Sequence, residues 1–288
     1  MQQALEFQLT HIKLRGIGFG DPAKPMILAL HGWLDNAASF IPVSEYLTDY
    51  YLVAIDLAGH GASDHRGADA HYHIVDFVYD IHELVTTQGW SKFVLMGHSL
   101  GAIIASLYAS SFSDYIDKLV CIEALGPITK SAETSPEQLR ESIINRLKLS
   151  FTPSKRPKTL EKIINARAYV GDLSLSSAEY LVRRNVIEQE GLLAYTTDRR
   201  LRTVSSLRMT DEQSQAFIRH ISCPVLLITG DKGFPLMQDL AKDRLTLLTQ
   251  GLHVCCAGNH HLHMDNPEQV AKKINYFLLL KAKTEGQK

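Results

Sequence analysis

Short apolar runs alternate with longer segments of helical periodicity along the first 125 residues, and this alternation restricts the possible folds more than any other feature. The runs are MILAL (26–30), YLVAI (51–55), FVLM (93–96) and KLVCI (118–122). Each is almost continuously apolar, as expected of a strand buried on both faces of a sheet. Helix-length segments lie between them, around residues 39–48, 73–88 and 100–112. This order predicts a mostly parallel α/β sheet with right-handed crossovers.

The two ends of the chain extend this sheet, and the middle interrupts it. Segments 4–10 and 12–19 alternate in polarity, which is typical of an antiparallel edge pair. The strand pattern resumes in CPVLLITG (223–230) and LHVCCAG (252–258), followed by an amphipathic helix from Pro267. Residues 129–216 show helical patterns but no convincing strand. We therefore predict a core formed by residues 1–127 and 218–288, with a helical insertion, residues 128–217, after the sixth strand.

One of the helices expected in the insertion has an apolar face. The segment SPEQLRESIINRLKL (135–149) has Pro136 near its first turn, which is a common place for proline in a helix. Its apolar side chains recur at helical spacing: Leu139, Ile143, Ile144 and Leu147.

The charge balance bears on possible partners. The chain of 288 residues has 30 Lys and Arg against 31 Asp and Glu, so its net charge of −1 gives no polycationic surface for nucleic acid. Residues 129–216 hold 15 Lys and Arg against 11 Asp and Glu, which is +4, and the remainder is −5. The excess weakly favours an anionic substrate, although a solvated basic face is the simpler interpretation.

The four cysteines form no CxxC pair and are expected to be reduced thiols in the core. No signal peptide is expected from the first sixteen residues. The apolar stretch 93–112 contains glycines and a histidine, so a buried strand, turn and helix explain it better than a membrane span. We expect a cytoplasmic protein without membrane insertion.

The sequence GHSLG (97–101) follows the strand FVLM and precedes a helical segment. This is the G-x-S-x-G nucleophile elbow in the strand–turn–helix context that it requires. The turn is strained, and the residues two before and two after the serine must be small to avoid the neighbouring strand and helix. Ser99 is therefore the predicted nucleophile.

The predicted oxyanion hole combines two turns at the same edge of the sheet. HGW (31–33) follows the strand MILAL, and its glycine permits a sharp turn that directs the next N–H toward an acyl oxygen. The helix after the elbow begins at Leu100, where N–H groups lack helical partners. We predict that the backbone N–H groups of Trp33 and Leu100 bind the oxyanion, and that the Trp33 indole lines the pocket.

A histidine-rich loop, GNHHLHMDNP (258–267), follows the last strand and is suited to deliver a general base. His260, His261 and His263 compete for this role. The same residues contain His261-x-His263-x-Asp265, most of a metallohydrolase motif. Asn266 replaces the final histidine and only one helix follows, so we predict neither a metal nor a cofactor.

Taken in order, HGWLDNAASF, DLAGHGASD, GHSLG and GNHHLHMDNP resemble the α/β-hydrolase superfamily, and more narrowly its serine hydrolase-like proteins. The resemblance covers residues 4–280, including DRRL (198–201) and RMT (208–210) in the insertion. It implies an eight-stranded mostly parallel sheet, a helical cap after strand six and a Ser–acid–His triad. It also implies that the first histidine of the loop, His260, is the catalytic one.

The acid of the triad departs from the commoner superfamily pattern. Most relatives place it as the fourth residue of a G-x-x-D stretch after strand seven, but Gly233 stands at that position here. Glu123, at the end of KLVCIE on strand six, occupies the other site known to serve. A carboxylate there is costly without a partner. Glu123 is the predicted acid and Asp231 the runner-up.

These residues predict a serine hydrolase, carboxylesterase-like, that cleaves a carboxylester, thioester or lactone of a small molecule through an acyl-enzyme. Carbon–carbon bond hydrolases and cofactor-free haloperoxidases use the same triad and remain alternatives. The alternative from another class is a hydrolase-fold sensor that binds a ligand with little turnover. The sequence predicts no oligomeric state.

Overall fold

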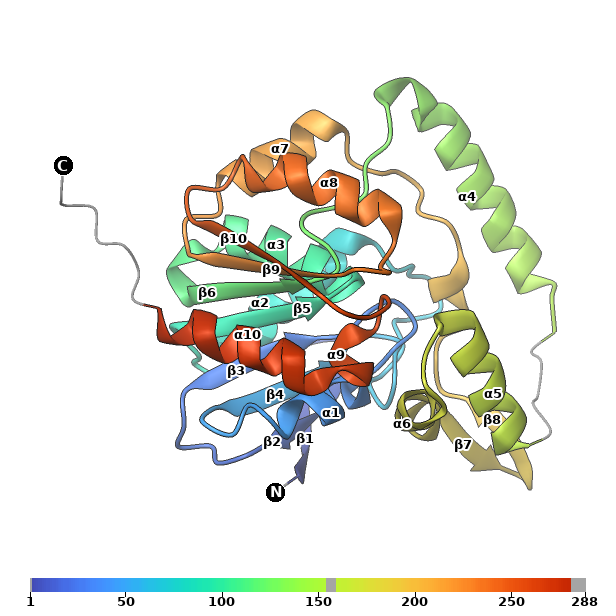
Figure 1. Ribbon diagram of the computed structural model, residues 1–288. Coiled ribbons are helices and arrows are strands. Elements are labelled where there is room, and N and C mark those ends of the chain that lie inside the picture. Colours follow the sequence, from blue (N-terminus) through green and yellow to red (C-terminus); the bar gives the residue numbers. More distant parts are fainter. Residues whose placement is uncertain (1, 154–158, 281–288) are drawn as a thin grey trace.

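The computed structural model describes residues 2–153 and 159–280, and its centre is an eight-stranded sheet with the strand order β1-β2-β4-β3-β5-β6-β9-β10 (Figure 1). The strands are β1 (Gln2–Gln8), β2 (Lys13–Phe19), β3 (Met26–Leu30), β4 (Tyr51–Asp56), β5 (Phe93–His98), β6 (Ile116–Ile122), β9 (Val225–Gly230) and β10 (Gly251–Cys256). Every apolar run singled out in the sequence lies in one of these strands. The predicted α/β-hydrolase sheet is confirmed.

The sheet is parallel except at one edge. β1 pairs antiparallel with β2, and β2 pairs antiparallel with β4, as the alternating polarity of the N-terminal segments predicts. Along the rest of the sheet, in the order β4-β3-β5-β6-β9-β10, all neighbouring strands pair in parallel. The carboxyl ends of β3, β5, β6 and β9 therefore meet at a single edge, where loops from distant parts of the sequence come together.

Helices cover both faces of the sheet (Figure 1). One face packs against α2 (Ile74–Thr87) and α3 (Leu100–Ser111), and the other against α1 (Ile41–Ser44), α9 (Leu262–Asp265) and α10 (Pro267–Leu279). α8 (Pro235–Leu245) joins β9 to β10. The helix expected around residues 39–48 is shorter than predicted: a 3-10 turn at Ala37–Phe40 leads into the single turn of α1.

The insertion lies between β6 and β9, as predicted, but it is not wholly helical. It contains α4 (Ser135–Ser150), α5 (Leu160–Gly171), α6 (Leu175–Asn185) and α7 (Asp211–Arg219). Between α6 and α7 an antiparallel hairpin forms from β7 (Val186–Gln189) and β8 (Leu192–Tyr195). The prediction of no strand in this region is wrong, because the reversal at Glu190 and Gly191, both with positive φ, permits a short hairpin.

The structure also tests the expectations about the cysteines and about a membrane span. Cys121, Cys223 and Cys256 are buried free thiols, but Cys255 is exposed, so the expectation of core thiols is wrong for that residue. None of the helices within residues 2–153 and 159–280 has the length and apolar character needed to cross a membrane.

Candidate active site

Ser99 lies on a strained turn between β5 and α3. Its backbone adopts φ 50° and ψ −113°, a conformation that non-glycine residues rarely occupy. The flanking glycines explain why the turn is possible: a Cβ at Gly97 would overlap the Gly101 backbone, and one at Gly101 would overlap the Leu30 carbonyl. The sequence therefore folds into the predicted elbow, with the serine at the first turn of a helix.

Glu123 follows β6, the strand next to β5, and also has a positive φ, 65°. Its carboxylate is 1% exposed and has two partners. Oε1 accepts a hydrogen bond from the Gly230 N–H at 2.5 Å, and Oε2 lies 3.0 Å from His260 Nδ1. The buried carboxylate thus has the partners that its desolvation requires, one of them the predicted base.

The runner-up acid lies elsewhere. Asp231 Oδ1 accepts a hydrogen bond from the Gly258 N–H at 2.8 Å, and Asp231 is exposed. Gly233, where most relatives carry the acid, packs directly on Glu123: a Cβ added there would overlap the Glu123 carboxylate. The Glu123 carboxylate fills the space that a side chain at position 233 would enter.

The three histidines of the last loop have separate surroundings. His260 is the one in contact with Glu123, and its carbonyl oxygen accepts a hydrogen bond from His98 Nε2 at 2.9 Å. His261 Nε2 lies 3.2 Å from Asp35 Oδ2. His263 is buried beside Phe40, and neither of its ring nitrogens has a hydrogen-bond partner among the described residues.

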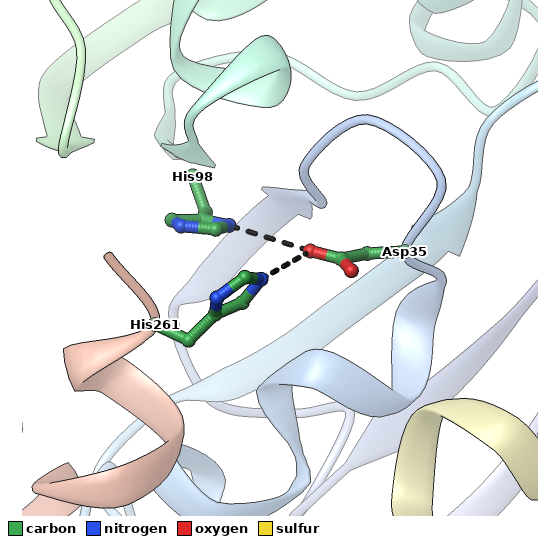
Figure 2. A group of neighbouring side chains, drawn as sticks. All are labelled: Asp35, His98 and His261. Atoms are coloured by element: carbon green, nitrogen blue, oxygen red, sulfur yellow. Dashed lines mark hydrogen bonds and ion pairs between the residues drawn. The ribbon is translucent and has the colours of Figure 1, made fainter. Parts of the chain in front are cut away.

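Asp35 joins the core loops to the insertion. Its Oδ2 lies 3.7 Å from His98 Nδ1 as well as 3.2 Å from His261 Nε2 (Figure 2). Its Oδ1 accepts a hydrogen bond from Arg167, which comes from α5, at 2.5 Å. Burial opposes ionisation, but the contacts with His261, Arg167 and His98 hold the pKa of Asp35 well below its usual value.

The same trio has the donor atoms of a metal site. Ligand atoms of Asp35, His98 and His261 lie within 4.8 Å of one another, and all three residues are buried. However, Nη2 of the Arg167 guanidinium lies 3.3 Å from His261 Nε2. The same guanidinium already neutralises the Asp35 carboxylate. A second cation would be repelled by this guanidinium, so the residues do not fit a resident metal ion.

Burial sets the protonation of the surrounding histidines. It lowers the pKa of His98, with the neighbouring histidines adding to the effect. Burial likewise lowers the pKa of His60 to about 3 and that of His263 to about 3. These rings are therefore neutral near pH 7.

A cavity of about 480 Å³ opens above the elbow, and both Ser99 and His260 line it. The core contributes Trp33, Leu34 and Phe234. The insertion contributes apolar side chains together with polar and charged ones: Ile163, Val170, Leu181, Val182 and Val186, and Arg167, Asp172, Asn185, Thr197 and Arg202. Trp33 lines the cavity, and its Nε1–H donates a hydrogen bond to the Leu201 carbonyl at 2.9 Å. Leu100 begins α3 directly after Ser99.

Fold and site together define the class of protein to which the chain belongs. Residues 25–267 match the family described by the α/β-hydrolase fold, and the chain is a member of that family. It is 33% identical over 275 residues to a Drosophila melanogaster protein named "Probable serine hydrolase", covering 90% of this chain and 82% of the relative. It is 29% identical to human serine hydrolase-like protein 2, covering 90% and 88% of the two chains.

Solved structures agree with this assignment. A hypothetical protein from Pseudomonas aeruginosa PAO1 is 34% identical, with a TM-score of 0.86 over 96% of this chain and 99% of that one. A thioesterase domain from the curacin biosynthetic pathway is 24% identical, with a TM-score of 0.82 over 96% and 99% of the chains, and shows the shared fold.

The structure adds two residues to the site that the sequence did not suggest. Asp35 stands in the HGWLDN segment quoted for the resemblance, but no role was assigned to it. An acidic residue two positions after HGW was the available signal. For Arg167 the sequence offers no such signal, because nothing in the helix LEKIINARAYVG (160–171) indicates which of its side chains turns toward the sheet.

Proposed function

We propose that this protein is a serine hydrolase that cleaves an ester-type bond of a small molecule through an acyl-enzyme. The observation that carries the proposal is the contact between His260 Nδ1 and the buried Glu123 carboxylate, at the rim of a cavity that also contains Ser99. A carboxylate on Nδ1 favours the tautomer in which Nδ1 carries the proton. Nε2 is then the nitrogen available to a serine hydroxyl.

In the proposed reaction, Ser99 Oγ attacks the acyl carbon while His260 takes the hydroxyl proton. The backbone N–H groups of Trp33 and Leu100 stabilise the oxyanion. His260 then gives its proton to the leaving alcohol or thiol, and the acyl-enzyme forms. Water, deprotonated by His260, attacks the acyl-enzyme and regenerates Ser99. Glu123 stabilises the imidazolium in both halves. No cofactor takes part.

We propose further that residues 128–217 act as a cap that selects the substrate. Ile163, Leu181 and Val182 from the insertion line the cavity above Ser99. Such a wall favours a substrate with an apolar acyl or alcohol group, because burying apolar surface contributes about 25 cal/mol per Å². Carboxylesters, thioesters and lactones are the bonds proposed.

The test is the Ser99→Ala variant, which should lose covalent labelling by a fluorophosphonate and lower ester hydrolysis by roughly 10³-fold or more. A panel that varies acyl length, and compares ester, thioester and lactone, identifies the bond. Ser111→Ala is the matched control, because Ser111 is an exposed serine at the far end of the same helix. Labelling that persists in Ser99→Ala places the nucleophile elsewhere. Labelling of the wild type without multiple turnover on any substrate favours the ligand-binding sensor.

A further inference from the structure

Asp35 closes the turn that carries one of the two proposed oxyanion donors. The Asp35 N–H donates a hydrogen bond to the Gly32 carbonyl at 3.1 Å, so residues 32–35 form a tight turn with Trp33 at its second position. The third position, Leu34, has a φ of 63°. A leucine rarely adopts a positive φ, and such a conformation persists only where the surrounding structure holds it. The turn that carries the Trp33 N–H is therefore strained and needs support.

The Asp35 carboxylate packs against the start of this turn. A Cβ added at Gly32 would lie 2.8 Å from Asp35 Oδ2 and 2.8 Å from His98 Nδ1. The absence of a side chain at Gly32 thus lets the carboxylate and the ring reach the backbone of the turn. Asp35 belongs to the cavity wall but is only 1% exposed. Its carboxylate therefore offers a substrate almost no surface, and it acts on the reaction through its neighbours.

The same carboxylate contacts the loop that carries the proposed base. Its Oδ2 lies 3.2 Å from Nε2 of His261, the residue that follows His260. It also lies 3.7 Å from Nδ1 of His98, and Figure 2 shows both rings directed at this one oxygen. The His98 ring donates from Nε2 to the His260 carbonyl at 2.9 Å. His260 is thus connected to Asp35 by two routes, one through each neighbouring ring.

The insertion holds the other oxygen of the carboxylate. Arg167 Nη2, from α5, donates to Asp35 Oδ1 at 2.5 Å. The Asn185 side chain, at the end of α6, donates to the Leu34 carbonyl at 3.3 Å. Two helices of the insertion therefore contact the carboxylate or its turn. The position of Asp35 depends on whether the insertion is seated on the core.

We propose that Asp35 is a positioning residue that holds the Trp33 turn and the His260 loop in a fixed relation to each other, and that Arg167 makes this relation depend on the seated insertion. The inference rests on the proposed function, because it concerns the two parts of the site that must meet at Ser99. A displacement of about 1 Å in such a site can lower the rate roughly 10²-fold. The two parts come from opposite ends of the chain, and the buried Asp35 carboxylate contacts both.

Steady-state kinetics of Asp35→Ala and Asp35→Asn test the proposal, with phenyl acetate as the substrate and circular dichroism to give the folded fraction. Asp35→Ala should lower kcat of the folded protein roughly 10²-fold. KM should change much less, because the variant displaces the base and the oxyanion donor without removing a substrate contact. Asp35→Asn keeps the shape and one acceptor oxygen, so it should retain more of kcat. A role confined to stability would leave kcat of the folded protein unchanged in both variants.

Arg167→Met and Arg184→Met are a matched pair, because each takes an arginine of the insertion away from a buried aspartate of the core. Asp56, the partner of Arg184, also accepts hydrogen bonds from the N–H groups of Ala37 and Ala62, which lie away from the His260 loop in the chain. Arg167→Met should therefore lower kcat of the folded protein. Arg184→Met should lower stability and leave kcat near the wild-type value. Equal kcat in the two variants overturns the role assigned to the insertion.

Proton NMR reports on the two parts of the site without any turnover. The Nδ1–H of His260 at the Glu123 carboxylate should give a low-field resonance, identified by its loss in His260→Gln. The indole N–H of Trp33 should give a second, identified by its loss in Trp33→Phe. Both should shift or broaden in folded Asp35→Ala. Resonances that keep their position and width overturn the proposal, and so does a wild-type kcat in that variant. A wild type that hydrolyses no ester refutes the proposed function instead, and the two resonances still decide the positioning.

Discussion

In the sheet and its flanking helices, buried apolar side chains form two large clusters, one on each face. Among the described residues, the insertion between β6 and β9 contributes Leu201 to one of these clusters and also forms a small cluster that includes Met264 of the core. Two ion pairs also join it to the core: Arg167 of α5 contacts Asp35, and Arg184 of α6 contacts Asp56 through Nη2 and Oδ2 at 2.7 Å. α4 is held by polar contacts.

This difference shows that the core and the insertion are specified by different features of the sequence. The core is specified by the alternation of apolar runs, which determines strands, helices and their burial. The insertion is positioned by a few buried acidic side chains at the ends of core strands, each matched to one arginine. The proposed chemistry and the positioning of the insertion are divided in the same way, because Ser99, Glu123 and His260 all belong to the core.

The largest expected effect tests whether the chemistry resides wholly in the core. Glu123→Gln should lower kcat by roughly 10²- to 10⁴-fold, because a neutral amide neither holds the proposed tautomer nor stabilises the imidazolium. Asp231→Asn should retain most of the activity, since Asp231 contacts the Gly258 N–H and not His260. Ester hydrolysis by both folded variants decides the matter, and the reverse ranking would return the acid to strand seven.

The second prediction concerns the ion pairs of the insertion. Arg184→Met should lower the free energy of unfolding by about 3 kcal/mol or more, because it leaves the fully buried Asp56 carboxylate without its cation. Arg183→Met is the matched control: this neighbour on α6 pairs with Glu179 at the surface, and its loss should cost less than about 1 kcal/mol. Urea unfolding measures both. Equal costs would show that charge does not secure the insertion.

The third prediction uses the buried histidines of the core. His60, His98 and His263 have pKa values below that of an unfolded histidine, near 6.5. The unfolded chain therefore binds more protons, and stability falls as the pH drops from 6.5 toward 3, with each ring contributing up to about 1.4 kcal/mol per pH unit. His263→Leu should flatten the slope by about one proton. Urea midpoints between about pH 6.5 and 4.5 give the slope, and an unchanged slope in His263→Leu would refute this assignment.

The last prediction is that removing metal ions has no effect on activity. EDTA should leave activity unchanged, because the Arg167 guanidinium provides the positive charge that the Asp35 carboxylate requires. The measurement is ester hydrolysis after dialysis against the chelator. Loss of activity that zinc restores would mean that Asp35, His98 and His261 bind a metal after all.

The sequence predicts the core well and the insertion poorly for a physical reason. Strands such as Phe93–His98 are buried on both faces, so their composition alone identifies them. The hairpin at Val186–Tyr195 is short and partly exposed, and its reversal at Glu190 and Gly191 lacks the usual Asn-Gly or Asp-Gly signal.

The residues of the candidate site also differ in how readily the sequence predicts them. Ser99 is predicted from a local motif, because the five-residue elbow and the strand and helix that flank it are contiguous in the sequence. Glu123 and His260 needed the family pattern as well, and the structure places them 3.0 Å apart. The contact between Asp35 and Arg167 joins residues 132 positions apart. No local pattern predicts such a contact, since aspartate and arginine are also common on exposed surfaces, where they need no distant partner.

The glycine at position 233 has a consequence for how a hydrolase with this proposed site could diversify. Because Glu123 supplies the carboxylate from strand six, the segment after β9 carries no proposed catalytic side chain, yet its Lys232 and Phe234 line the cavity. Lys232 can then change with the substrate without altering Ser99, Glu123 or His260, whereas Phe234 packs against the His260 ring, with 4.3 Å between the ring centroids. Position 233 itself is constrained: a side chain there would overlap the Glu123 carboxylate, so an acid could serve from this position only if Glu123 changed at the same time.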